Sequence, residues 1–146
     1  MIHTDQQNSS LSFYKKGTAA AFGDVDFYPN GGISQPGCSI DDIDDLIRKA
    51  VSEGLKTFLS CSHFRAIDYY LESITDSGKC LHLGYECRSY EDFLAGVCGH
   101  CHDDTHLCSE MGFHANIYYP KSLKLSRSEP IKLYFNTNKK KPFCRE

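Results

Sequence analysis

The sequence predicts a mixed α/β protein that is rich in disulfide bonds. Two short segments, 24–28 and 131–136, alternate apolar and polar residues with the period of a β-strand. Two longer segments, 39–59 and 61–74, place apolar residues at the three- and four-residue steps of an amphipathic helix. Eight cysteines are many for 146 residues and favour disulfide bonds formed in an oxidising compartment.

Length, charge and hydropathy narrow the classes of protein that the chain can belong to. A chain of 146 residues with 40% apolar and 24% charged residues is typical of one globular domain. Its net charge of −3 does not favour a nucleic-acid partner, and the Lys139–Lys141 run is interpreted as a solvated tail. No apolar run approaches the roughly 20 residues of a membrane span, so no transmembrane segment is expected.

The first ten residues, MIHTDQQNSS, differ from a secretory signal peptide. They lack its basic beginning and its apolar centre. Asn8 nevertheless begins an N-glycosylation pattern, Asn8-Ser9-Ser10, which agrees with the cysteine content in favouring a secreted protein. We therefore expect a signal peptide upstream of this chain.

The first third of the chain predicts strands, a turn and a helix. Residues 1–5 are expected to end a buried strand, and 24–28 to form a strand that stops at the turn Asn30-Gly31-Gly32. Ser39 can cap the helix 39–59, whose early aspartates and later basic residues suit the helix dipole. The apolar residues of this helix include Ile40, Ile43, Leu46 and Ile47 on one face, with Leu55 and Phe58 in a second patch.

Cys38 and Cys61 bracket this helix, and two interpretations stay open. The segment can be a helix packed on the core and stapled by a disulfide. It can also be a mobile flap whose apolar face is covered at rest and exposed to a lipid surface when open.

The second helix is expected to begin after Cys61, with Ser62 as its cap. Cysteine-rich turns are expected from there to Cys108, and 131–136 is expected to be a half-buried terminal strand. The apolar residues that share one face of the second helix are Phe64, Ile67, Tyr70, Leu71 and Ile74.

His63 and Asp5 are the candidate catalytic residues. A histidine at a loop-to-helix junction can meet a substrate and act as a general base, and a carboxylate at a strand end can orient an imidazole. The alternatives are a surface or capping histidine and an ordinary turn aspartate. The chain contains no G-x-S-x-G pentapeptide of the kind that holds a hydrolase nucleophile.

Residues 98–108, CGHCHDDTHLC, offer a third constellation. Thiolates and imidazoles bind zinc tetrahedrally, so the segment resembles a zinc site. It has only one C-x-x-C pair, so we expect these cysteines to form disulfides, with no metal and no cofactor in the protein. The potential zinc ligands are Cys98, His100, Cys101, His102, His106 and Cys108.

These segments together resemble the C-terminal part of the catalytic domain of the animal pancreatic-type lipases. That family includes triacylglycerol lipases and phospholipases A1, and the resemblance implies a partial α/β-hydrolase fold with a lid. The matching segments cover nearly all of the chain and are IHTD (2–5), VDFYPNGG…QPGC (25–38), CSHFRAIDYYLESI (61–74), YEC (85–87), C…CGHC…C…MGFHA (98–115) and LYFNTN (133–138).

The resemblance implies a role for His63 and for the cysteines. His63 matches the family's catalytic histidine, which takes the proton of a serine and later gives it to the leaving alkoxide. The segment 38–61 becomes the lid, and its length of about 22 residues between the cysteines favours neutral glycerides. The implied disulfides are Cys38–Cys61 at the lid, Cys87–Cys98 and Cys101–Cys108, which leaves Cys80 and Cys144 as a fourth pair.

The chain also departs from the family pattern. In the family, the nucleophile, the oxyanion-hole residues and the usual catalytic aspartate all precede IHTD, whereas Asp5 lies near the place where other α/β-hydrolases carry their acid. The ending resembles single-domain arthropod members and leaves no room for a C-terminal β-sandwich domain.

We therefore expect part of a secreted carboxylic-ester hydrolase that acts on glycerides or phospholipids at a lipid interface. The chain alone is predicted to be inactive. The alternative is a catalytically inactive protein that binds a lipid or a partner.

Overall fold

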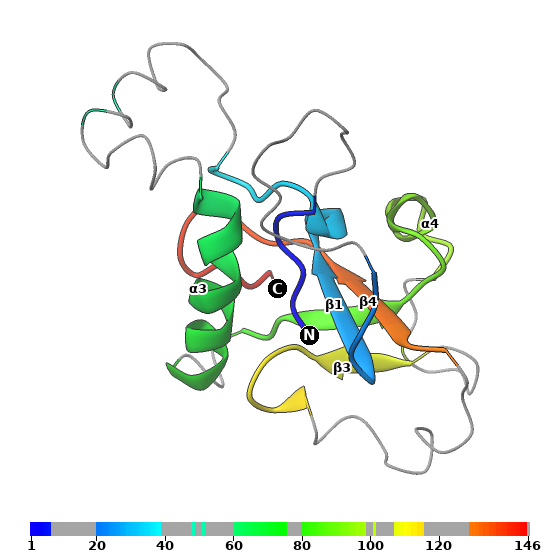
Figure 1. The fold of residues 1–146 in the computed structure, drawn as a ribbon. Helices are drawn as coiled ribbons and strands as arrows, with labels where there is room; N and C mark the ends of the chain where they lie inside the picture. Colours follow the sequence, from blue (N-terminus) through cyan, green and yellow to red (C-terminus); the bar gives the residue numbers. More distant parts are fainter. Residues whose placement is uncertain are drawn as a thin grey trace.

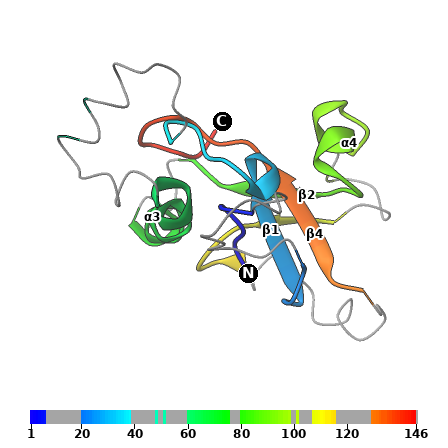
Figure 2. The same cartoon turned by 45° about the horizontal axis from the view of Figure 1, so that its top comes forward.

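A four-stranded mixed sheet with one helix against each face forms the described part of the protein (Figures 1 and 2). The computed structural model describes residues 1–6, 20–38, 48, 51, 60–75, 80–98, 101, 107–115 and 129–145. The elements are β1 (Val25–Pro29), η1 (Asn30–Gly32), α3 (Cys61–Thr75), β2 (Leu83–Glu86), α4 (Tyr90–Leu94), β3 (Cys108–Glu110) and β4 (Ile131–Phe135).

The sheet brings together segments that are far apart in the sequence. Its strand order is β1-β4-β2-β3, and β1 runs parallel to β4 with Phe27 opposite Leu133. The other two pairings, β4 with β2 and β2 with β3, are antiparallel. Residues 1–3 continue the sheet beyond β1, because the N–H of Phe27 donates to the carbonyl of Met1 and the N–H of His3 donates to that of Phe27.

The core lies on both faces of this sheet. On the α3 side, Phe27, Leu133 and Phe135 pack against Tyr69 of the helix and Phe143 of the C-terminal segment. On the α4 side, the buried residues are Tyr28, Tyr134 and the disulfide-bonded Cys87 and Cys98, against which Tyr90 and Phe93 of α4 pack. Alternate residues of one strand point to opposite faces, so β1 and β4 each serve both halves of the core.

The strand at 131–136 was predicted correctly in place but not in burial. It was expected to be half-buried, whereas Tyr134 on the supposedly exposed face is 7% exposed. The reason is its central position between β1 and β2, where α4 and the ring of Tyr28, 5.3 Å from that of Tyr134, cover the second face.

The prediction of cysteine-rich turns up to Cys108 missed three short elements, β2, α4 and β3. Each has only three to five residues, too few to show a period. Local chemistry still explains them. The Ser89 hydroxyl accepts from the N–H of Asp92 and caps α4. A Cβ at Gly84 would lie 3.0 Å from that of Leu133, so this glycine lets β2 approach β4 closely.

The turn after β1 needs its glycines. Gly31 and Gly32 have φ angles of 76° and 77°, which favour glycine over any other residue. A Cβ at Gly31 would also lie 2.6 Å from the ring of Tyr90. The turn is therefore pressed against α4, whose Tyr90 hydroxyl donates to the Asn136 side chain at 2.6 Å.

Four disulfides hold the loops to this framework. The Cα atoms of the bonded pairs lie between 5.4 and 5.8 Å apart, within the ordinary range. The pairs are the four that the sequence analysis expected: Cys38–Cys61, Cys80–Cys144, Cys87–Cys98 and Cys101–Cys108.

The apolar residues of α3 do share one face, but that face is exposed. The helix turns Tyr69, Glu72 and Ser73 towards the rest of the molecule. The five apolar side chains of the opposite stripe are between 42% and 55% exposed. They are Phe64, Ile67, Tyr70, Leu71 and Ile74 and are called the α3 stripe below. No described helix has the length and apolar character that a membrane crossing requires.

The α3 stripe predicts that chain 1–146 on its own binds hydrophobic dyes. Replacing Ile67 and Leu71 together by lysine is expected to roughly halve the fluorescence of bound anilinonaphthalene sulfonate, because the apolar α3 stripe is interrupted. Leu94→Lys is the matched control, since Leu94 is 60% exposed but lies on α4. Equal fluorescence from the two variants would contradict the prediction.

Candidate functional site

His63 is the third residue of α3, and its side chain is exposed. The helix begins at Cys61, which is disulfide-bonded to Cys38 and precedes the histidine by two residues. The imidazole makes an edge contact with the ring of Phe64, with the centroids 6.0 Å apart. A group outside the described residues can therefore reach it, as a general base requires.

The other described histidines are placed differently. His3 and His82 are each 4% exposed, and His114 is half-buried at the far end of α3. The exposure of its side chain distinguishes His63 from the buried His3 and His82. The spacing of the histidines in the sequence could not make this distinction.

His3 and Asp26 form a buried pair that the sequence analysis missed. The imidazole Nε2 of His3 lies 2.6 Å from the Asp26 carboxylate, and the ring stacks on Tyr28 with centroids 4.4 Å apart. Asp26 also accepts from the N–H of Gly23 at 2.9 Å. Since both side chains are almost fully buried, this histidine–carboxylate pair braces residues 1–3 against β1 and does not face solvent.

Main-chain contacts fix the turn that carries His63. The N–H of Gln35 donates to the Ser62 hydroxyl at 3.1 Å. Ser62 had been expected to cap the helix from outside, but α3 begins at Cys61 and Ser62 is its second residue. The Thr4 hydroxyl donates to the main-chain oxygen of His63 at 3.5 Å. Two separate segments thus reach the first turn of α3.

Gln35 is the second residue that the sequence analysis missed. It is 1% exposed, and its amide joins four segments of the chain. The amide nitrogen donates to the carbonyls of Thr4 (3.2 Å) and Pro29 (3.0 Å). The amide oxygen accepts from the Asn30 side chain (2.8 Å) and the Tyr69 hydroxyl (3.0 Å). A lone glutamine in a loop carries no sequence pattern that could have indicated this.

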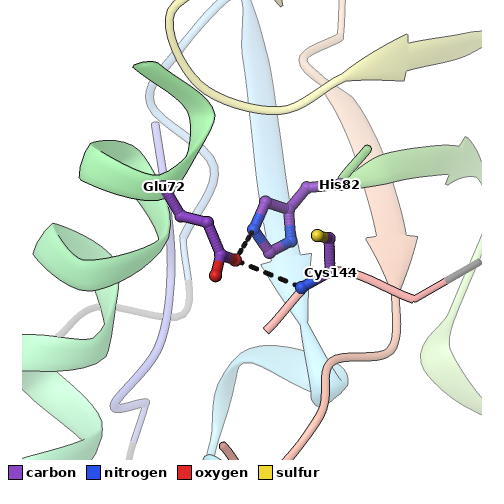
Figure 3. A group of neighbouring side chains, drawn as sticks. All are labelled: Glu72, His82 and Cys144. Carbon is purple, nitrogen blue, oxygen red and sulfur yellow. Dashed lines mark hydrogen bonds and ion pairs between the residues drawn. The ribbon is translucent and has the colours of Figure 1, made fainter. Parts of the chain in front are cut away.

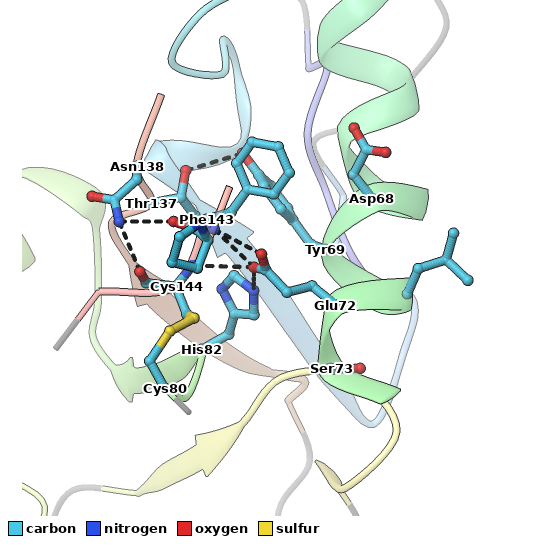
Figure 4. Close-up of polar contacts among 12 residues, drawn as sticks. Asp68, Tyr69, Glu72, Ser73, Cys80, His82, Thr137, Asn138, Phe143 and Cys144 are labelled. Atoms are coloured by element: carbon cyan, nitrogen blue, oxygen red, sulfur yellow. Dashed lines mark hydrogen bonds and ion pairs between the residues drawn. A yellow bond between two sulfur atoms is a disulfide. The ribbon is translucent and has the colours of Figure 1, made fainter. Parts of the chain in front are cut away.

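Thr137 completes the network around Gln35, and Figure 4 shows its contact with Tyr69. Its hydroxyl lies 3.0 Å from that of Tyr69 and accepts from Asn30 at 2.8 Å, while its N–H donates to the Asn30 oxygen. Burial raises the pKa of Tyr69, so the hydroxyl keeps the proton that it donates to Gln35.

Of the other predicted site residues, Asp5 is described in the structure, whereas the glycosylation and lid residues are not. Asp5 is half-buried and directly follows Thr4, the residue that contacts His63. Asn8 and the predicted lid residues Ile40, Ile43, Leu46, Ile47, Leu55 and Phe58 lie outside the described residues. In the lid segment, Arg48 and Val51 are described, and both are helical and exposed.

Glu72, His82 and Cys144 form a second cluster beside the C-terminal segment (Figure 3). The Glu72 carboxylate accepts from His82 Nε2 at 2.7 Å and from the N–H groups of Phe143 and Cys144 at 2.8 and 3.1 Å. Burial lowers the pKa of His82, a shift that the neighbouring carboxylate only partly opposes. A neutral imidazole with its proton on Nε2 fits this geometry, because buried Nδ1 has no hydrogen-bond partner.

This second cluster does not suit a metal ion. The sulfur of Cys144 is bonded to that of Cys80, so it is no thiolate ligand, and the carboxylate is already engaged by three donors (Figure 4). The cysteines of the zinc alternative are likewise in disulfides, Cys98 with Cys87 and Cys101 with Cys108. Glu72 therefore acts as a clamp for the C-terminal segment.

Two open cavities lie elsewhere. One of about 540 Å³ borders Cys87, Arg88 and Lys132, and one of about 490 Å³ borders Tyr85, Phe93 and Arg145. His63 lines neither of them.

Comparisons with known proteins agree over nearly the whole chain. The family model described as "Lipase" matches residues 1–143. The inactive pancreatic lipase-related protein 1 of Mus musculus is 34% identical over 99% of this chain, and the pancreatic triacylglycerol lipase of Cavia porcellus is 32% identical over the same share. Lipase member H-B of Xenopus laevis is 34% identical, also over 99%. The chain spans 29%, 30% and 27% of these three proteins, respectively.

The Glu72–His82 pair predicts that the C-terminal segment loosens on mild acidification. The unfolded imidazole takes up a proton near its ordinary pKa of about 6.5, whereas the buried one does so only at lower pH. The stabilisation that neutral His82 contributes is therefore complete above about pH 6.5. It is lost as the pH falls towards the lower pKa that His82 has in the folded protein. Amide-exchange protection factors at Phe143 and Cys144 should fall between pH 7.5 and 5.5.

The matched variant for this experiment is His82→Gln. The glutamine amide can still donate to Glu72 but does not titrate. In this variant, the protection factors of Phe143 and Cys144 should change less between about pH 7.5 and 5.5. An equal decrease in the variant and the parent would show that His82 is not responsible.

Proposed function

Because the chain belongs to the pancreatic-type lipase family, we propose that it forms part of a secreted carboxylic-ester hydrolase acting on glyceride or phospholipid esters. The observation that carries this proposal is the placement of His63. It is exposed at the start of α3, beside the Cys38–Cys61 disulfide, whereas His3 and His82 are buried. Four disulfides agree with an extracellular location.

In the proposed reaction, His63 acts first as a general base and then as a general acid. Its imidazole takes the proton of a serine hydroxyl as the serine attacks the ester carbonyl, and it returns this proton to the leaving alkoxide. Water then attacks the acyl-serine with His63 again as base. Asp5 remains the candidate in this chain for the acid that orients the imidazole. Its neighbour Thr4 binds the main chain of His63, which supports this assignment.

The serine belongs to polypeptide beyond this chain in this proposal. The chain has no G-x-S-x-G pentapeptide and spans less than a third of the relatives described above. The exposed α3 stripe supports a further layer of structure, since an apolar helix face of this size is usually covered. Residues 1–3, which extend the sheet beyond β1, support further strands on that side.

We also propose that residues 38–61 form a lid over the site. The Cys38–Cys61 disulfide closes this segment at its base, with the Cα atoms 5.5 Å apart. Val51 is 83% exposed, which suits a segment that meets a lipid interface. The amphipathic pattern of 39–59 supports the same role.

An inactive lipase-like binding protein is the second candidate. The name of the mouse relative, an inactive pancreatic lipase-related protein, favours it, as does the absence of a G-x-S-x-G pentapeptide from residues 1–146. The two candidates differ in whether the secreted protein hydrolyses an emulsified ester, so one assay separates them.

The hydrolase proposal predicts that His63→Ala abolishes activity. The longest protein that the gene encodes, in its secreted form, should release fatty acid from tributyrin emulsions or phosphatidylcholine vesicles. The substitution should lower kcat on the order of 10⁴-fold or more, because the serine loses its general base. His114→Ala is the control, since His114 lies next to Phe113, which binds Ser73 near the other end of α3.

The outcomes of this assay divide clearly. Near-parental activity of His63→Ala would overturn the catalytic assignment. No hydrolysis by the parent protein on either lipid, together with binding to the vesicles, would favour the inactive lipid-binding candidate.

A further inference from the structure

Gln35 is placed to control the position of His63, although the two residues are far apart in the sequence. It lies in the loop after η1, three residues before Cys38. Its amide makes two donated and two accepted hydrogen bonds, which is the full capacity of a glutamine side chain. Rotating the amide by 180° would set its nitrogen against the Asn30 donor and its oxygen against two carbonyls, so the network allows one orientation.

The main chain of Gln35 binds both sides of the disulfide at the start of α3. Its N–H donates to the hydroxyl of Ser62, the residue between Cys61 and His63. Its carbonyl accepts from the N–H of Cys38 at 2.9 Å. The disulfide and Gln35 therefore hold the same turn from two directions.

The side chain of Gln35 fixes the helix at a second level. Tyr69 donates to the amide oxygen, and it lies seven residues after Ser62, about 10 Å along the helix axis. Two attachment points on one helix prevent it from sliding or rotating about its axis. The Thr4 carbonyl that Gln35 binds belongs to the residue whose hydroxyl reaches the His63 main chain.

We propose that Gln35 is the positioning residue for His63, an inference that rests on the proposed function. Gln35 is neutral, so it acts on the geometry of the imidazole and not on its charge. A misplacement of a catalytic group by about 1 Å can cost on the order of 100-fold in rate. A glutamine network that fixes the helix is therefore a substantial part of the catalytic design.

The test compares the loss of the Gln35 amide contacts with the loss of the hydroxyl contacts of Ser73, a residue of α3. Both variants are made in the longest secreted protein that the gene encodes. Gln35→Met keeps the length of the side chain and removes all four amide hydrogen bonds. It should lower kcat by roughly 10- to 100-fold and leave KM within about threefold. Ser73→Ala is the matched control, because it removes partly buried hydrogen bonds to Phe113 and Tyr70 near the opposite end of the same helix.

Both variants are expected to be less stable, so activities are compared at temperatures where each is fully folded by circular dichroism. Ser73→Ala should keep kcat within about twofold of the parent. An unchanged kcat in Gln35→Met, or equal losses in the two variants, would overturn the positioning role. Loss of activity in His63→Ala with no loss in Gln35→Met would overturn this inference alone and leave the proposed function intact.

Two further measurements keep the inference testable if Gln35→Met does not fold. Tyr69→Phe removes only the hydroxyl that binds the Gln35 oxygen and keeps the packed ring, and it should lower kcat a few-fold. The ring resonance of His63, identified by its absence in His63→Ala, should broaden in Tyr69→Phe and stay sharp in Ser73→Ala. A resonance and a kcat like those of the parent in Tyr69→Phe would contradict the positioning role.

Discussion

A single buried amide, that of Gln35, joins the segments on which the candidate site depends. It receives or donates hydrogen bonds to residues 4, 29, 30 and 69, which belong to the N-terminal segment, β1, η1 and α3. A buried polar group is costly unless it is paired, so this network is stable only when all four segments are in place together. The position of His63 is thereby coupled to the completed fold.

Glu72 makes the corresponding attachment for the C-terminal segment. Its carboxylate binds two main-chain N–H groups and His82, and the Cys80–Cys144 disulfide closes the same segment covalently. Arg65 adds a contact, with its guanidinium carbon 4.4 Å from the centre of the Phe143 ring. The inward face of α3 therefore combines the core ring of Tyr69 with two polar residues, Glu72 and Ser73. The other five large apolar residues form the exposed α3 stripe.

Histidine chemistry in this protein is decided by burial. His3 and His82 both pair with a carboxylate, as a catalytic histidine does, yet both are enclosed and serve to attach chain segments. His63 has an exposed imidazole and a fixed backbone. In this protein, the two buried histidine–carboxylate pairs are therefore structural attachments, because neither imidazole can be reached from solvent.

Much of the fold and part of the candidate site could be predicted from the sequence, because periodicity and local chemistry are written in neighbouring residues. The strands near 25–29 and 131–135, the helix after Cys61 and the glycine turn follow from such patterns. The catalytic role expected of His63 is implied by the family resemblance instead. Burial, by contrast, depends on which elements become neighbours. Only the tertiary structure decided that Tyr134 is covered, that the α3 stripe faces outward, and that Gln35 and Glu72 bind segments from distant parts of the chain.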